Sequence, residues 1–132
     1  MNQEKVLEVF VQLRKTYNLL GEIMDCSRQM AESLDRDDNT AFQMLLTMRR
    51  EPIQELAATK ERVQELLSEF PGTEGEQLRS VLNGASGSDP LEEKIADQVG
   101  ANSRLFQQIS ELDCRLSDKV AHERSVYARN NT

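Results

Sequence analysis

The sequence predicts an all-α protein, an elongated antiparallel three-helix bundle or coiled coil with one extra short helix. Apolar residues recur at alternating steps of three and four along three long segments, the spacing of amphipathic helices. Turn-forming residues separate these segments. Hydrophobic content is 38%, aromatics 5%, and 30% of residues are charged, which suits slender helices better than a compact globule. At 132 residues, the chain is expected to form a single helical domain, residues 1–132.

The first helix is predicted over residues 3–35, a rod about 50 Å long at the helical rise. Its apolar row keeps the three-and-four spacing throughout, and further apolar side chains widen it into a stripe that packs against two neighbours. The row comprises Val6, Phe10, Leu13, Tyr17, Leu20, Met24, Ser27, Ala31 and Leu34, flanked by Val9, Ile23 and Met30.

An acidic turn follows, and Asp38 is predicted to cap the second helix, residues 39–70. The turn is not a calcium loop, because Thr40 and Leu46 stand where an EF-hand needs glycine and a bidentate glutamate. Pro52 is expected to kink this helix without ending it. Arg49 and Lys60 interrupt the apolar row and are expected to extend their charges to water. The row comprises Phe42, Leu46, Arg49, Ile53, Leu56, Lys60, Val63, Leu67 and Phe70.

A short helix is predicted over residues 75–83, then a flexible Gly/Ser linker over 84–89 and a last helix over 90–127. Asp89 before Pro90 is a strong helix-start signal. The apolar row of the last helix is continuous from Leu105 to Leu116 and diluted by polar residues at both ends. Such a helix needs partner helices along its centre, and the two other long segments are expected to supply them. The linker would let it detach, or exchange its apolar face from this chain to a partner.

Composition excludes several classes of function. The formal net charge is −7 and no segment is basic, so neither nucleic-acid binding nor attraction to an anionic membrane is expected. The chain contains no signal-peptide hydrophobic region and no stretch long enough to span a bilayer, which predicts a cytoplasmic protein without membrane insertion. In that compartment, Cys26 and Cys114 are expected to be packing residues rather than a disulfide.

The sequence offers no catalytic constellation. Its single histidine, His122, cannot supply the two Glu-x-x-His motifs of a carboxylate-bridged metal bundle, and two isolated cysteines make no zinc site. No phosphate-binding glycine loop is present. The carboxylates alternate with Arg and Lys, as on solvated helix surfaces. We therefore expect no enzyme, no cofactor and no bound metal.

Four methionines are predicted to gather toward one end of the first two helices. Antiparallel pairing about the turn near Asp37 brings Met30 close to Met44, and Met24 and Met48 fall in the same region. These side chains either fill irregular gaps in the core or form a second, adaptable apolar surface for a partner.

The order of these elements resembles the FlgN-type flagellar export chaperones, with the FliT-type proteins as near neighbours. The resemblance covers nearly the whole chain: a long first helix, the acidic turn at 34–38, a second helix, a short helix, a Gly/Ser linker, and a long last helix with Val99-Gly100-Ala101-Asn102 near its start. Family members often carry a more Asn-rich stretch there, of which only Asn102 is present. Members are cytosolic, acidic and mostly helical.

The resemblance implies a type III export chaperone that binds the C-terminal helical segments of hook–filament junction or filament-cap proteins. Such a chaperone prevents premature assembly and delivers its clients to the export apparatus. The resemblance places client binding on the last helix, and the expected residues are Leu105, Phe106, Ile109, Leu112, Leu116 and Val120. The alternative prediction, from the apolar stripes alone, is a self-associating coiled-coil structural or adaptor protein with its stripes buried in a homodimer.

Overall fold

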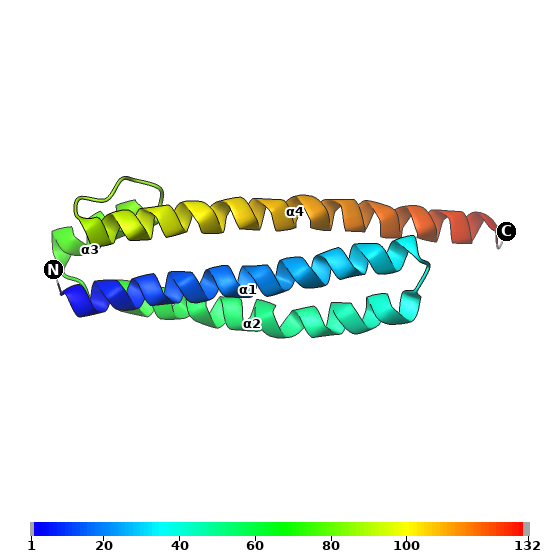
Figure 1. Ribbon diagram of the computed structural model, residues 1–132, viewed down its shortest axis with the longest axis horizontal. Helices are drawn as coiled ribbons and strands as arrows, with labels where there is room; N and C mark the ends of the chain where they lie inside the picture. The colour runs from blue at the N-terminus through cyan, green and yellow to red at the C-terminus, as the bar shows by residue number, and fades with distance from the viewer. Residues whose placement is uncertain (1, 131–132) are drawn as a thin grey trace.

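The chain folds into four helices. The structure, a computed structural model, describes residues 2–130, and their side chains as far as residue 122. The helices are α1 (Gln3–Asp35), α2 (Asn39–Ser68), α3 (Gly72–Leu82) and α4 (Pro90–Asn130), and no strand occurs among the described residues (Figure 1). The all-α prediction is confirmed. The short helix begins three residues earlier than predicted, α2 ends two residues earlier, and α4 continues to Asn130.

Side-chain caps fix where the helices begin. The Asn2 side chain accepts a hydrogen bond from the backbone N–H of Glu4 at 3.0 Å, and Asp38 accepts one from Ala41 at 3.0 Å, as predicted. Asp89 accepts one from the N–H of Glu92 at 2.8 Å, which satisfies an otherwise free donor in the first turn of α4. Pro52 lies inside α2, and the helix continues through it.

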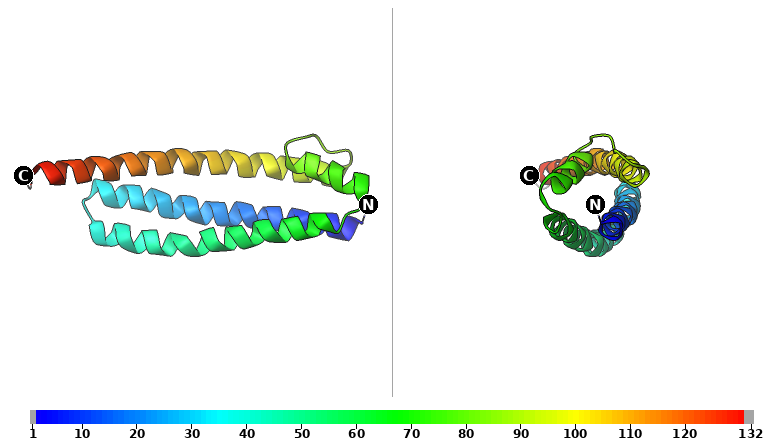
Figure 2. Two further views of the ribbon diagram at one scale, coloured as in Figure 1. Left: turned by 180° about the vertical axis from the view of Figure 1, so that it is seen from behind. Right: turned by 90° about the vertical axis from the view of Figure 1, so that its left-hand side faces the viewer.

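The three long helices lie side by side, with α1 packed against both α2 and α4 (Figures 1 and 2). Helix α2 runs antiparallel to α1, and α4 runs parallel to α1. The expected packing of the last helix against both others is not confirmed. Among the described residues, no Cα atom of α2 comes within 8 Å of a Cα atom of α4. Helix α1 is therefore the shared neighbour, and one side of the arrangement has no direct helix–helix interface.

The short helix α3 fills this side at the end of the molecule where the chain begins (Figure 2). Its side chains Leu78 and Val81 are fully buried between the long helices. They belong to a core cluster, here the α3 cluster, to which all four helices contribute. Its members are Val6, Val9, Leu13, Val63, Leu66, Leu67, Phe70, Leu78, Val81 and Ile95.

A second core cluster, here the distal cluster, holds the other end together without any residue from α3. Its buried members are Leu20, Ile23, Met24, Met30, Leu34, Phe42, Ile109, Leu112 and Leu116. Most of these come from α1 and α4, and α2 contributes one buried member, Phe42. The apolar face of α2 is thus less completely covered here than beside α3.

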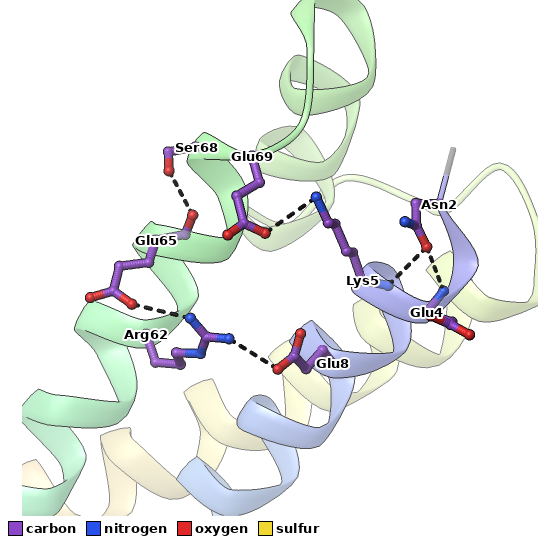
Figure 3. Close-up of polar contacts among 8 residues, drawn as sticks. All are labelled: Asn2, Glu4, Lys5, Glu8, Arg62, Glu65, Ser68 and Glu69. Carbon is purple, nitrogen blue, oxygen red and sulfur yellow. Dashed lines mark hydrogen bonds and ion pairs between the residues drawn. The ribbon is translucent and has the colours of Figure 1, made fainter.

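Polar contacts join the end of α2 to the beginning of α1 (Figure 3). Lys5 pairs with Glu69 at 3.4 Å, and Arg62 donates to Glu8 at 3.0 Å and to Glu65 at 3.2 Å. The hydrogen bonds to Glu8 and Glu65 raise the pKa of Arg62 above its ordinary value. Exposed pairs of this kind contribute little to stability, so their effect is mainly on the register of the two helices.

The loop between α3 and α4 is fastened by a buried carboxylate. The Glu92 side chain is only 1% exposed, and it accepts hydrogen bonds from Gln77 Nε2 at 3.0 Å and from the Ser88 hydroxyl at 2.9 Å. A Cβ atom at Gly87 would overlap the backbone of Glu92 and Glu93, so the loop passes directly over the first turn of α4. Pairing a buried carboxylate in this way is required to offset the cost of removing it from water. Detachment of α4 would break these contacts.

Candidate partner-binding groove

A groove runs between α2 and α4 on the side that α3 covers only at one end. A cavity of about 680 Å³ lies between the two helices, and a second cavity of about 360 Å³ lies along the same face of α2, where residues of α1 and α2 line it. Their lining residues on α2 extend from Asn39 to Gln64, which corresponds to about 38 Å of helix. We call this surface the groove.

The larger cavity lies toward the α1–α2 turn. Its floor is formed by Met30 and Leu34 of α1, one wall by Phe42 and Leu46 of α2, and the other by residues of α4 that include Leu116. Polar side chains stand among these apolar ones. The α4 lining comprises Asp113, Leu116, Ser117, Val120 and Ala121, and the polar lining from α2 comprises Asn39, Gln43 and Arg49.

The smaller cavity lies nearer to α3 and is almost wholly apolar. Leu13 and Thr16 of α1 line it together with Ile53, Leu56 and Ala57 of α2, and with Lys60, Val63 and Gln64. Ile53 is 44% exposed, although it belongs to the apolar row of α2. Ile53 therefore adds an exposed apolar side chain to the edge of this cavity.

Phe106 of α4 is an exposed aromatic residue that lies outside the lining of either cavity. It stands two helical turns before Asp113, which lines the larger cavity, so the two residues share one face of α4. The contact between Arg49 and Asp113 fixes the antiparallel register of α2 and α4, and this register brings position 106 level with Leu56. The phenyl ring is 57% exposed. Helix periodicity and this register therefore place Phe106 on the groove side of α4, at the level of Leu56.

One polar bridge crosses the groove. Arg49 NH1 of α2 donates to Asp113 Oδ1 of α4 at 2.7 Å and to the Ser27 hydroxyl of α1 at 3.0 Å. Among the described residues, this is the hydrogen-bonded link between α2 and α4. The Nε atom of Arg49 is buried without a hydrogen-bond partner. The expectation that the charge of Arg49 reaches water is thus wrong, because the guanidinium turns inward to a carboxylate. No sequence pattern identifies this partner, since Asp113 is one of many acidic residues on α4.

The six residues of the last helix that were predicted to bind a client fall into two groups, packed and exposed. Ile109, Leu112 and Leu116 are buried in the distal cluster, with Leu105 and Val120 packed against it. Phe106 is exposed, on the face toward the groove. Five of the six therefore contribute to packing within the chain in this conformation, and Phe106 is available to a partner.

The four methionines do not form one surface. Met24 and Met30 are buried members of the distal cluster, whereas Met44 and Met48 are exposed. Met48 lines a separate cavity with Cys26 and Pro52, on the opposite side of α2 from Ile53. Two of the methionines therefore fill core gaps, and the other two lie away from the groove.

Other classes of site were sought among the described residues: metal centres, membrane-spanning helices and disulfides. No group of three or more His, Cys, Asp or Glu side chains is placed to hold a metal ion among residues 2–122. Within residues 2–130, none of the helices combines the length and hydropathy needed to cross a bilayer. Cys26 and Cys114 are both free thiols, as expected.

Comparisons with models of known protein families, with curated proteins and with solved structures gave no match to this chain.

Proposed function

We propose that this protein is a cytoplasmic chaperone of the flagellar export type, which shields an amphipathic helix of a client protein in the groove between α2 and α4. The observation that carries the proposal is that apolar side chains of α1 and α2 line the groove and that no helix among the described residues covers them. A client helix laid there would complete the packing that α3 provides at the other end. Binding of an amphipathic helix in an apolar groove is a recurring mode of recognition.

The dimensions of the groove support a helical client. About 38 Å corresponds to a helix of about twenty-five residues. Its apolar stripe would contact Leu13 on the floor, Ile53 and Leu56 on one wall, and Phe106 on the other. In this proposal the chain acts by binding and performs no catalysis. The flagellar identity of the client, a hook–filament junction or filament-cap protein, rests on the resemblance of the helix order.

The proposal is tested with a client fragment of the last ~40 residues of a junction protein, about one helical hairpin at the helical rise. We expect a stoichiometric complex by size-exclusion chromatography with light scattering. Phe106→Ser and Ile53→Ser should each weaken binding roughly tenfold or more, as substitution of a buried apolar anchor does. Leu7→Ser, an equally exposed apolar residue of α1, serves as the matched control and should leave affinity unchanged.

A second candidate function, a self-associating coiled-coil adaptor, is favoured by one observation outside the groove. Leu7 and Val11 stand one turn apart on α1 and are both about half exposed. Burial of this pair in a homodimer would give a particle of twice the chain mass. A tight dimer that Leu7→Ser dissociates and that ignores the client fragment would support this function and contradict the chaperone proposal.

A further inference from the structure

The groove has a distinctive charge pattern in a chain of net charge −7. Lys60 lines the smaller cavity beside Ile53 and Leu56. Arg50 stands four residues after Leu46 and three before Ile53, both of which line the cavities, so it lies on the groove side of α2. Each cation is exposed, and neither has a hydrogen bond or ion pair with another described residue.

The sequence around these two cations provides no partner on the same helix. Residues three and four positions from Lys60 are Leu56, Ala57, Val63 and Gln64, and those around Arg50 are Leu46, Thr47, Ile53 and Gln54. None is acidic, so no carboxylate on α2 is placed to neutralise either charge. Arg62, on the opposite side of α2, shows the contrast, because it pairs with both Glu8 and Glu65.

The facing wall of α4 supplies no free carboxylate either. The residues on the groove side of α4 beyond α3 are uncharged except for Asp113, and its carboxylate already accepts from Arg49 at 2.7 Å. The uncharged members are Ser103, Phe106, Ser110, Ser117 and Ala121. The groove therefore combines apolar side chains with the Arg49–Asp113 pair, and Lys60 and Arg50 are two unpaired positive charges along its α2 rim.

Helix α3 shows what kind of element this side of the molecule accepts. It is an eleven-residue amphipathic helix whose Leu78 and Val81 are fully buried against the long helices. The groove continues the surface that α3 covers, beginning at Val63, which belongs to the α3 cluster and also lines the smaller cavity. A second helix in line with α3 would meet the same apolar row of α2, with Lys60 and Arg50 at its edge.

We propose that the groove binds a helix of another protein that carries acidic residues about three turns apart along the edge of its apolar stripe, where they pair with Lys60 and Arg50. Ten residues separate the two cations, which places them about 15 Å apart along α2. The inference rests on the proposed function, since it defines the chemistry of the helix that the groove receives. Complementary charge at the rim selects the partner and its register, and the apolar walls supply the affinity.

The test uses two synthetic amphipathic helices of about twenty-five residues, each with one apolar stripe. One carries Glu at two positions eleven residues apart beside the stripe, and the other carries Gln there. Fluorescence anisotropy with the full chain should give roughly tenfold tighter binding of the Glu peptide at low salt, and the advantage should shrink at high salt. The double variant Arg50→Glu, Lys60→Glu should abolish or reverse the preference.

Lys15→Glu is the matched control, because Lys15 lies beside Glu55 and Arg62 on the opposite side of α2. It should keep the preference of the unaltered chain for the Glu peptide. Equal affinity for the two peptides, or a preference that Lys15→Glu alters as much as Lys60→Glu, overturns the inference. So does a homodimer that Lys60→Glu dissociates, because the occupant is then a second copy. If flagellar tails bind and the peptides show no preference, the inference fails while the proposed function stands; if the Glu peptide is preferred and the tails do not bind, the flagellar client fails instead.

Discussion

The two ends of this molecule use the same three long helices with different results. Beside α3, the space between α2 and α4 is filled by Leu78 and Val81, and the α3 cluster draws on all four helices. Toward the α1–α2 turn, no such helix is present among the described residues, and a cavity of about 680 Å³ lies between the same two helices. Helices α2 and α4 both pack against α1, but these three helices alone do not enclose a complete hydrophobic core. A fourth element is needed, and the chain supplies it over only part of its length.

The largest effect should come from removing a side chain where the core is filled. Leu78→Ala leaves a cavity among fully buried neighbours and should lower the free energy of unfolding by about 2–5 kcal/mol. Ile53→Ala makes a similar change in the groove and should cost less than about 1 kcal/mol, because Ile53 is already partly exposed. Urea denaturation followed by circular dichroism measures both. Equal losses would show that the groove half is packed as tightly as the α3 half.

A smaller effect is expected at the bridge across the groove. Asp113→Ala leaves the mostly buried guanidinium of Arg49 without its carboxylate and should lower the free energy of unfolding by about 1–3 kcal/mol. Adding Arg49→Met should recover part of that loss, since no unpaired charge then remains. A double-mutant cycle in urea gives the coupling between the two residues. If the single and double variants are all as stable as the parent chain, the bridge does not hold α2 and α4 together.

The smallest effect is expected at the surface pair near the end of the distal cluster. Lys119 Nζ lies 2.8 Å from Asp35 Oδ1, and both side chains are largely exposed. Lys119→Ala should lower the free energy of unfolding by no more than about 1 kcal/mol, and the difference should vanish at high salt because the charges are screened. Thermal melts at two salt concentrations test this. A loss that persists at high salt would indicate a packing role for the Lys119 side chain.

Much of the fold was predictable because it depends on local chemistry. The three-and-four spacing located the long helices, and Asp38 and Asp89 were correctly expected to precede their first turns. The beginning of α3 was missed because Gly72 and Gly75 are poor helix formers, and their place in a helix depends on packing against the end of α2. Of the candidate groove, Phe106 was predicted, but Ile53 and Lys60 were read only as members of an apolar row.

The sequence by itself determined that this protein is helical, where its long helices lie and which side chains form their apolar rows, because periodicity and capping act within a few residues. Only the tertiary structure decided which rows meet. It buried Glu92 beneath the α3–α4 loop, turned Arg49 toward Asp113, and left Ile53 and Phe106 exposed. These outcomes follow from the relative placement of helices that are far apart in the chain. Apolar residues spaced by three and four identify the apolar face of a helix, but they do not identify the helix that packs against it.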